Sequence, residues 1–353
     1  AVRQAGLHPN RGNTVWWGDD DVRTEAFADD RIGVHTDRAR LEGTLLSAVE
    51  AAGATLLRGT TARSAEETDS GWVVHARGPE DEAVEVKARW IVDATGRHGL
   101  LARHEGRLPD RATTTVALVR RFRRDGGWAP AISGHTLVES YPDGWAWSLP
   151  LADDVRCFTV MIDQRETAVE GTDLGAMLEH ELGQAPNIAA LLDGAAPEGD
   201  AWACPASLYT AERFGREGLL LAGDAGSFID PLSSFGVKKA LSSGWLAGIT
   251  IHTALTEPTM TTAALDFFDA RERAVYQSFR ASSGEFFEGA ARVYGTDYWT
   301  KRAEAAREAL LAGTRDGDRV DPVDPLEPPL PEDEIRSAFD TIRAVDALRA
   351  RPG

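Results

Sequence analysis

The sequence predicts an α/β protein in which an antiparallel sheet is inserted between two parts of a parallel-sheet domain, followed by a helical C-terminal region. Two runs, Trp90–Asp93 and Gly218–Asp224, are short and mostly apolar and end in a carboxylate, which is typical of buried parallel strands. Residues 113–163 contain successive strand-like segments without helices between them, which indicates an antiparallel sheet. The 353 residues suffice for two domains, or for one domain with an insertion.

The expected domain boundaries follow these changes of pattern. The first part of the parallel-sheet domain covers 1–112, the antiparallel-sheet domain 113–205, the second part of the parallel-sheet domain 206–258, and the helical region 259–353.

Local patterns predict the individual elements. Asp37 is a plausible N-cap for a helix that ends at Gly53. One face of this helix is apolar and consists of Leu41, Leu45, Leu46 and Val49. The expected strands outside the parallel runs are 55–58, 72–76, 83–86, 113–122, 136–140, 144–151 and 155–162. The later helices are expected at 171–193, 236–255, 260–287 and 332–349, with an exposed Pro-rich linker at 314–332.

The composition excludes several classes of partner. Asp plus Glu number 56 against 38 Lys plus Arg, which gives a formal net charge of -18. Such acidity disfavours sequence-independent binding to nucleic acid and docking on anionic membranes, because both need basic residues. The sequence lacks both an apolar run of about 18 residues and the apolar core of a signal peptide. We therefore expect a cytoplasmic protein without a membrane span or a metal, whose Cys157 and Cys204 are buried, reduced thiols.

The strongest functional signal is the segment Gly218–Gly236, GLLLAGDAGSFIDPLSSFG. In an open parallel sheet, ligands bind beyond the carboxyl ends of the strands, where Asp224 can accept a hydrogen bond from a ribose hydroxyl. The helix that opens at Gly236 and Val237 offers unpaired N–H groups to a phosphate or an anionic ring. An ordinary strand-to-helix loop that uses glycine only for turning is the alternative.

Three segments resemble the superfamily of FAD-dependent monooxygenases and tryptophan halogenases. GDAGSFIDPLSSFGVKKAL, at 223–241, is similar to its second flavin motif, and IVDATGRHG, at 91–99, to its Asp-x-x-Gly element. HTDRARLEGTLLSAVEAAGATL, at 35–56, resembles the helix and strand that precede that element. The segments occur in the family's order, and the resemblance covers most of residues 10–290.

The resemblance implies a Rossmann-like FAD-binding domain of the hydroxylase type. Asp224 would hold the ribitol or ribose of FAD, the Gly236 and Val237 backbone would face the isoalloxazine ring, and Arg38 would reach the diphosphate. Asp93 could instead cap a loop, and Arg38 could be an ordinary surface residue. The cofactor-binding residues implied are Arg38, Asp93, Gly96, Gly223, Asp224, Pro231, Gly236 and Val237.

A second candidate site is the strand GWAWSLP at 144–150. Alternation places Trp145 and Trp147 on one face, where they could wall an aromatic substrate pocket or pack in the core. The strand resembles the halogenase motif W-x-W-x-I-P, although related reductases and hydroxylases carry similar strands. Two departures count against halogenation. The halogenase lysine, expected near Asn13–Trp17, is absent, and the loop Ser233–Gly236 lacks the usual acidic residue.

The superfamily opens with a strand, a G-x-G-x-x-G turn and a helix that hold the ADP part of FAD. The sequence contains no G-x-G-x-x-G. A segment that precedes this sequence, a truncated gene and a strand from another chain are three open explanations. We expect a chain without that unit to bind FAD weakly and to leave strand edges unpaired.

The sequence therefore predicts an FAD-dependent oxidoreductase. The resemblance implies a monooxygenase that hydroxylates an aromatic or electron-rich substrate, small or peptide-linked, through a flavin hydroperoxide, with electrons from NAD(P)H or a partner flavin reductase. A halogenase, a double-bond reductase, and a non-catalytic flavoprotein relic or partner-binding scaffold remain alternatives. No catalytic residue is identified, and the candidate acid–base groups are His35, His135, Glu139 and Tyr209. A solvated helix face is expected for Lys238 and Lys239, which could instead stabilise an anionic flavin or substrate. Core positions are expected for five phenylalanines, which could instead line a pocket: Phe267, Phe268, Phe279, Phe286 and Phe287.

Overall fold

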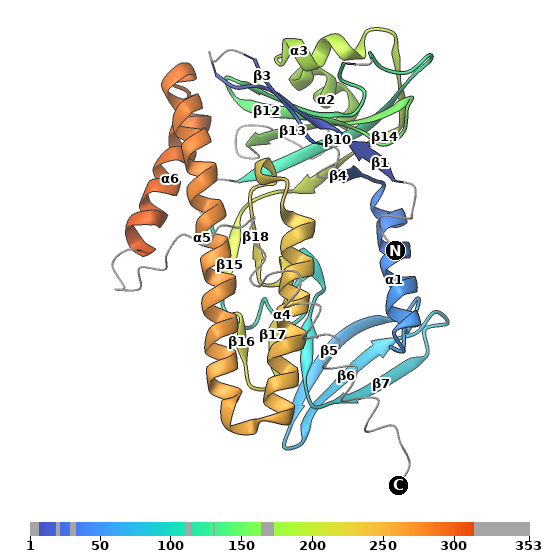
Figure 1. Cartoon of the computed structure of the whole chain (residues 1–353), viewed down its shortest axis with the longest axis vertical. Helices are drawn as coiled ribbons and strands as arrows, with labels where there is room; N and C mark the ends of the chain where they lie inside the picture. Colours follow the sequence, from blue (N-terminus) through green and yellow to red (C-terminus); the bar gives the residue numbers. More distant parts are fainter. Residues whose placement is uncertain are drawn as a thin grey trace.

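The computed structural model describes residues 7–18, 22–28, 33–110, 114–129, 131–163 and 173–313. The linker expected at 314–332 and the helix expected at 332–349 lie outside the described residues. A large sheet with two short helices above it forms one end of the molecule, and the long helices α4 and α5 run from it toward the small sheets at the other end (Figure 1).

The large sheet has seven strands in the order β14-β10-β13-β12-β11-β2-β3. Its neighbours pair antiparallel except β11 and β2, which are parallel. The bounds are β2 Gly12–Trp16, β3 Arg23–Ala26, β10 Thr115–Arg124, β11 His135–Tyr141, β12 Gly144–Pro150, β13 Val155–Asp163 and β14 Ala195–Pro205. The expected antiparallel insert is confirmed, but β2 and β3 join it from a segment assigned to the other domain. β14 was not expected, because its sequence AAPEGDAWACP carries no strand-like pattern.

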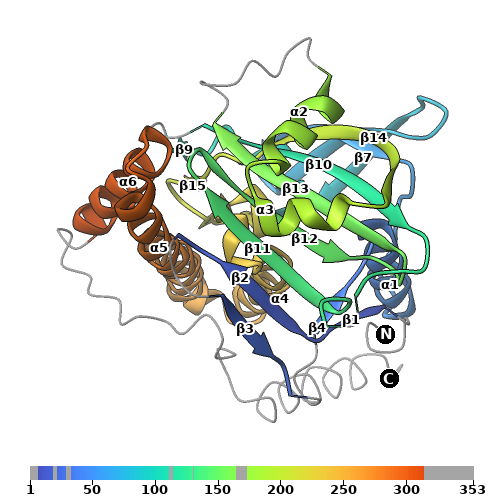
Figure 2. The same ribbon diagram turned by 90° about the horizontal axis from the view of Figure 1, so that it is seen from above.

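Helices cover both faces of this sheet (Figure 2). On one face, α2 Leu174–Leu182 and α3 Pro186–Ala189 pack over a core centred on Phe158. A single helix was expected at 171–193; in the structure α3 begins at Pro186, which cannot continue a preceding helix, and a short 3₁₀ turn, Ala190–Leu192, follows. On the other face, α5 Thr261–Tyr294 and α6 Asp297–Gly313 pack against Trp145 and its neighbours.

The parallel strands are β8 Ile91–Asp93 and β17 Leu219–Leu221, which pair in parallel as expected. β16 Gly215–Arg216 extends this sheet antiparallel, and α4 Gly236–Thr256 covers it through Leu246 and Ala247. The strand expected at 55–58 is absent, and this segment ends in a turn. No described strand lies beside it to supply ladder hydrogen bonds.

The smaller sheets surround this core. β5 Thr61–Thr68, β6 Gly71–Arg77 and β7 Ala83–Ala88 form one antiparallel sheet, which includes the expected hairpin. β1 His8–Asn10 pairs with β4 Gly33–His35, and β9 Arg107–Pro109 and β18 Ser227–Phe228 flank β15 Tyr209–Ala211.

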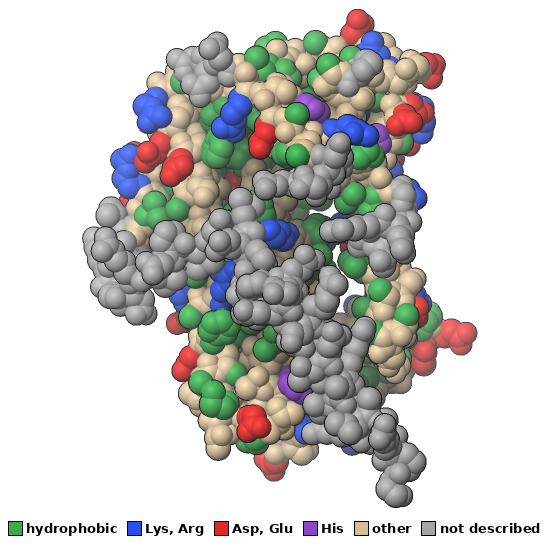
Figure 3. Space-filling model, in the orientation of Figure 1, with side chains coloured by type: hydrophobic (Ala, Val, Ile, Leu, Met, Phe, Trp, Pro, Cys, Tyr) green, Lys and Arg blue, Asp and Glu red, His purple; other side chains and the backbone are tan. Residues whose placement is uncertain are grey.

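Helix α1, Arg38–Ala51, joins β4 to the β5–β7 sheet and stands apart from the other helices (Figure 1). Asp37 caps it by accepting a hydrogen bond from the Ala39 N–H at 2.9 Å, as the sequence predicts. Its apolar face, however, is not a core face, because no residue of α1 is buried and Leu46 is 38% exposed. Apolar side chains are visible along this helix in the space-filling view (Figure 3).

Three further expectations are corrected. Phe267 is 59% exposed, whereas Phe268, one position further along α5, is fully buried. Cys204 is exposed and Cys157 is partly buried, and both are free thiols. Lys239 is only 4% exposed, so it does not lie on a solvated face.

Among the described residues, no helix combines the length and the apolar character that a membrane span requires.

Candidate functional site

The carboxyl end of β8 is held by Asp93. Its carboxylate, 3% exposed, accepts hydrogen bonds from the N–H and hydroxyl of Thr95 and from the N–H groups of Leu101 and Ala102. Burial alone would raise the pKa of Asp93, but these hydrogen bonds lower it below its usual value. Asp93 is therefore occupied in capping the loop that contains Gly96, where φ is +65°. Any contribution of Asp93 to a nucleotide crevice is through the shape of this loop.

The end of β17 lies beside it, because Leu221 pairs with Asp93 and the Ala222 N–H donates to the Asp93 carbonyl. The 3₁₀ turn Gly223–Ala225 carries Asp224, whose side chain is half-buried and whose carbonyl accepts from the Tyr209 hydroxyl. Gly223 has φ +60°, and a Cβ there would lie 3.0 Å from the Ala240 Cβ. Glycine is thus required by both conformation and close packing against α4.

Two side chains of α4 fix this turn. The Lys239 ammonium donates to the Gly223 carbonyl at 2.9 Å and to the Ser227 carbonyl at 2.6 Å, and the Ser243 hydroxyl accepts from the Gly223 N–H. Burial lowers the pKa of Lys239. Sequence analysis missed this role, because a lysine in a basic pair next to a helix start is usually solvated.

The N-terminus of α4 has no side-chain cap, and Gly236 has open space around its Cα. The preceding 3₁₀ turn begins at Pro231 and is capped by Asp230, which accepts from the Leu232 N–H. Val237 is 43% exposed. The first N–H groups of α4 therefore remain available to an anionic or carbonyl-bearing ligand edge.

Two arginines outside the predicted set lie at the same corner. The Arg97 guanidinium stacks 4.0 Å above the Phe228 ring, and that of Arg107 stacks 4.2 Å above the Tyr209 ring. Burial lowers the pKa of Arg97, whereas Tyr209 and Asp224 raise it. Burial raises the pKa of Tyr209 to about 12, although both arginines oppose the shift. Arg97 belongs to the IVDATGRHG segment, so its position after Gly96 was the signal that could have found it.

Trp145 and Trp147 share a face of β12, as alternation predicts, with ring centroids 5.2 Å apart. Trp145 is 2% exposed and packs in the core against Trp17, whereas Trp147 is half-buried. The same cluster contains Phe228 and Leu232 from the loop after Asp224. The tryptophan strand and the candidate cofactor loop therefore meet at one apolar contact.

The remaining candidates lie elsewhere. Arg38 is exposed on α1, and its recorded partner is Glu42, in an i,i+4 ion pair. His35 bonds to Thr136 in the region of the large sheet, and Glu139 accepts hydrogen bonds from three N–H donors at the start of α3. His135 likewise bonds within the large sheet. Of the four acid–base candidates, Tyr209 alone adjoins the Asp224 turn.

This corner fits the flavin and ribityl part of an FAD. It combines a half-buried carboxylate, an uncapped helix N-terminus, the Arg97 guanidinium stacked on Phe228 and the exposed apolar side chain of Val237. The described residues show no cluster of three or more His, Cys, Asp or Glu side chains that could hold a metal ion.

The sequence profile of the tryptophan halogenase family matches residues 22–316. The chain belongs to this family of FAD-dependent flavoproteins. A tryptophan 2-halogenase of Chondromyces crocatus is 27% identical over 247 residues, which are 68% of this chain and 47% of that protein. A flavin-dependent halogenase of Armillaria mellea is 27% identical over 213 residues, 55% of this chain and 41% of its own length. The chain thus matches less than half the length of these two halogenases.

Other relatives match over larger shares. LodB of Marinomonas mediterranea, named as an FAD-dependent oxidoreductase, is 25% identical over 83% of this chain and 78% of its own. The structure of CmlS, a flavin-dependent halogenase, superposes with a TM-score of 0.79 at 22% identity over 99% of this chain and 67% of that one. QhpG, a peptidyl tryptophan dihydroxylase, gives 0.68 at 24% identity over 85% of this chain and 65% of that one. These structures confirm the halogenase-like FAD-binding fold, and the named relatives favour the halogenase alternative over the hydroxylase expectation.

Proposed function

We propose that this protein is an FAD-dependent oxidoreductase of the halogenase type that acts on an aromatic or electron-rich carbon. The observation that carries the proposal is the juxtaposition of the Asp224 turn, the uncapped N-terminus of α4 and Arg97 at the carboxyl ends of two parallel strands. Membership of the tryptophan halogenase family supports it.

Each group at this corner has a role in the proposal. Asp224 accepts hydrogen bonds from the ribityl hydroxyls of FAD, and the first N–H groups of α4 donate to the electron-rich edge of the flavin. Arg97 supplies a positive charge, and Trp147 with Phe228 excludes water from the substrate side. FAD, when bound and reduced, would supply the reaction with oxygen; a transferred oxygen atom would come from O2, whereas a transferred halogen would come from halide ion that this chemistry oxidises. NAD(P)H or a partner flavin reductase is proposed as the electron source.

Hydroxylation is the second candidate. The resemblance to halogenases calls for a lysine near Asn13–Trp17, and β2 carries none. LodB and QhpG, which match this chain at comparable identity, are named as an oxidoreductase and a dihydroxylase rather than as halogenases. The nature of the transferred atom separates the two candidates.

The first test is the visible spectrum and intact mass of the purified protein, followed by titration with FAD. We expect flavin bands and saturable binding. Asp224→Ala should weaken FAD binding at least about tenfold, because a hydrogen bond to a charged group contributes about 1.5–3 kcal/mol. Asp266→Ala, an exposed carboxylate of α5, is the matched control and should bind FAD normally. Failure of the wild-type protein to bind FAD would favour the relic or scaffold alternative.

The second test supplies reduced flavin from a reductase and NADH to the protein with indole, phenol and pyrrole compounds. Products are compared by mass spectrometry with bromide, with chloride and without halide. A halogenase gives halogenated product only when halide is present. A product that gains oxygen regardless of halide would replace halogenation by hydroxylation, and turnover without oxygen would indicate a double-bond reductase.

A further inference from the structure

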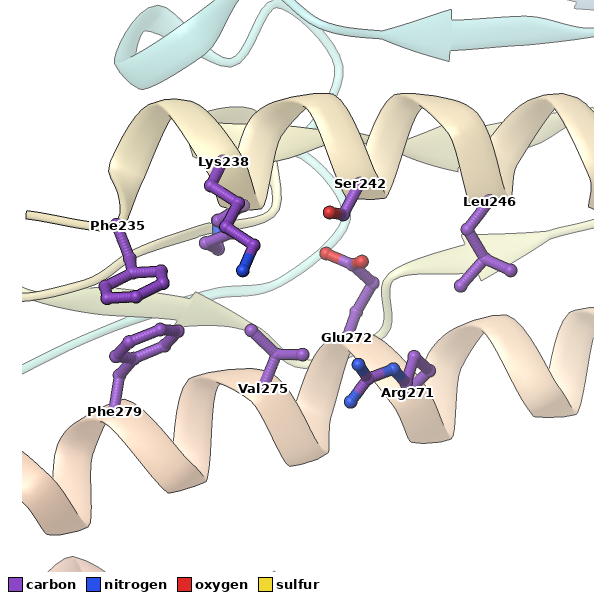
Figure 4. A pocket seen from close by; sticks show the side chains of 9 residues that line it. Phe235, Lys238, Ser242, Leu246, Arg271, Glu272, Val275 and Phe279 are labelled. Atoms are coloured by element: carbon purple, nitrogen blue, oxygen red, sulfur yellow. The ribbon is translucent and has the colours of Figure 1, made fainter. Parts of the chain in front are cut away.

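A pocket separate from the Asp224 corner opens between α4 and α5 (Figure 4). It holds about 490 Å³ of space not filled by protein atoms, including its open mouth. Phe235 and Phe279 form its apolar end, with ring centroids 5.2 Å apart. Lys238 enters from α4, and Arg271 and Glu272 enter from α5 (Figure 4).

Two polar atoms in this pocket have no hydrogen-bond partner. Glu272 is 3% exposed, and its Oε2 is buried and unpaired. The Nη1 of Arg271 is also buried and unpaired. Neither side chain forms an ion pair within 4.0 Å with any charged group in the described part of the chain. Because burying a polar atom without a hydrogen-bond partner is costly, both atoms indicate a missing polar neighbour.

The charged residues that line the pocket favour the binding of an anion. Three cationic residues face it, against one carboxyl group. Lys239 already donates to two backbone carbonyls, whereas Lys238 is exposed and contacts, within the described residues, the Phe235 ring at 5.2 Å. Lys238 and Arg271 therefore retain N–H donors for a ligand.

Glu272 can complement an anion when it carries a proton. Burial raises its pKa, which Lys239, Ser243 and Arg271 partly lower. A protonated carboxyl group donates a hydrogen bond, whereas the ionised form would repel an anion. The charged groups facing Glu272 are Lys238 and Lys239 from α4 and Arg271 from α5, and Asp224 acts on Lys239 from the turn beyond.

We propose that this pocket binds a small carboxylate that carries a short apolar group. The carboxylate accepts hydrogen bonds from Arg271 and Lys238, and protonated Glu272 donates to it. The apolar group lies against Phe235 and Phe279. The site is distinct from the cofactor corner and does not depend on the proposed reaction, although Lys239 contacts both.

The test titrates the purified protein with sodium propionate by calorimetry, with sodium chloride as the reference salt. We expect saturable binding of one propionate per chain, tighter at the lower of two pH values than at the higher one. Arg271→Met should weaken binding at least about tenfold, because it removes a charge-assisted hydrogen bond. Glu272→Gln mimics the protonated carboxyl group, so it should retain binding and lose the difference between the two pH values.

Arg292→Met, an exposed arginine of the same helix, is the matched control and should bind propionate like the wild type. If Arg271→Met does not fold, as judged by its thermal transition, Lys238→Met replaces it and should weaken binding several-fold. The absence of saturable binding would overturn the proposal and leave a pocket that holds water alone. Equal affinity in the wild type, Arg271→Met and Lys238→Met would also overturn it.

Discussion

The two main layers of the molecule are stabilised in different ways. In the sheet layer, which is the seven-stranded sheet with α2, α3, α5 and α6, both faces are covered and Phe158 is fully buried. Even its buried Arg156 is satisfied, with four hydrogen bonds to Ser148, Ile132 and His135. The sheet layer therefore resembles an ordinary apolar core, although the Arg121 Nε and the Trp128 Nε1 are buried in it without a hydrogen-bond partner.

The parallel layer, which is β8, β16 and β17 with α4, is different. Its main strands have three residues each, and Val92 and Leu241 are 37% and 52% exposed. Its buried part contains Asp93 and Lys239, both of which bind backbone groups of the site turns. The comparison indicates that apolar burial carries the stability of the sheet layer, whereas specific hydrogen bonds carry the geometry of the parallel layer.

The largest expected effect tests whether apolar burial stabilises the sheet layer. Phe158→Ala removes a ring packed 5.3 Å from Phe122 and 6.0 Å from Trp128 and should destabilise the protein by about 3–5 kcal/mol. Phe267→Ala makes the same change at a 59% exposed position and should cost about 0.5 kcal/mol or less. Urea unfolding of both variants measures the difference. Similar losses would show that the sheet layer is not the dominant core.

Acid stability provides the next test. Burial, with His8 and Arg156 nearby, lowers the pKa of His35 from 6.5 to about 4. Because the folded state resists protonation of this imidazole, stability should fall as pH drops through 6.5 and level off below about 4. The loss attributable to His35 is about 3 kcal/mol at most. His35→Gln should flatten the stability profile across that window, and a profile unchanged by this substitution would contradict the assignment.

Asp93 gives the corresponding test in the parallel layer, with a smaller effect. Asp93→Asn keeps one acceptor oxygen and loses the acceptor for two of the four hydrogen bonds, which should cost about 2 kcal/mol. Because hydrogen bonding lowers the folded-state pKa of Asp93, its contribution is present above about pH 4 and is lost as pH falls through that lower pKa. The variant should thus change the profile below pH 4 and leave the His35 window intact.

The fold could be predicted from the sequence where local patterns determine it, but not where it depends on tertiary packing. The apolar runs at β8 and β17 and the alternating strands of the sheet were predictable, because their patterns depend on local periodicity. Strand β14 and the loss of the strand at 55–58 were not, because pairing depends on neighbours distant in sequence. The burial of Lys239 and the exposure of α1 could not be predicted either, since both depend on tertiary packing rather than on residue type.

The candidate site, like the fold, was predicted in part from the sequence. Gly96, Gly223, Asp224 and Gly236 lie on the turns that the motifs indicate, since each motif ends a strand or begins a helix. Arg97 was missed although it follows Gly96 in the motif, because its stacking on Phe228 depends on β18, which is distant in sequence. Their roles toward FAD stay predictions that the binding experiments test.

The smallest expected effect separates stability from function at one residue of the parallel layer. A Cβ at Gly236 would meet no atom within 4 Å, and alanine is the better helix former, so Gly236→Ala should stabilise the protein by about 0.5 kcal/mol. If the Gly236 backbone faces the flavin, the added methyl group should nevertheless weaken FAD binding, because it prevents close approach of the ring. Gly244→Ala, further along α4 and equally open, should stabilise the helix without changing FAD affinity. Thermal unfolding and FAD titration of both variants provide the measurement, and equal FAD affinities would remove Gly236 from the cofactor site.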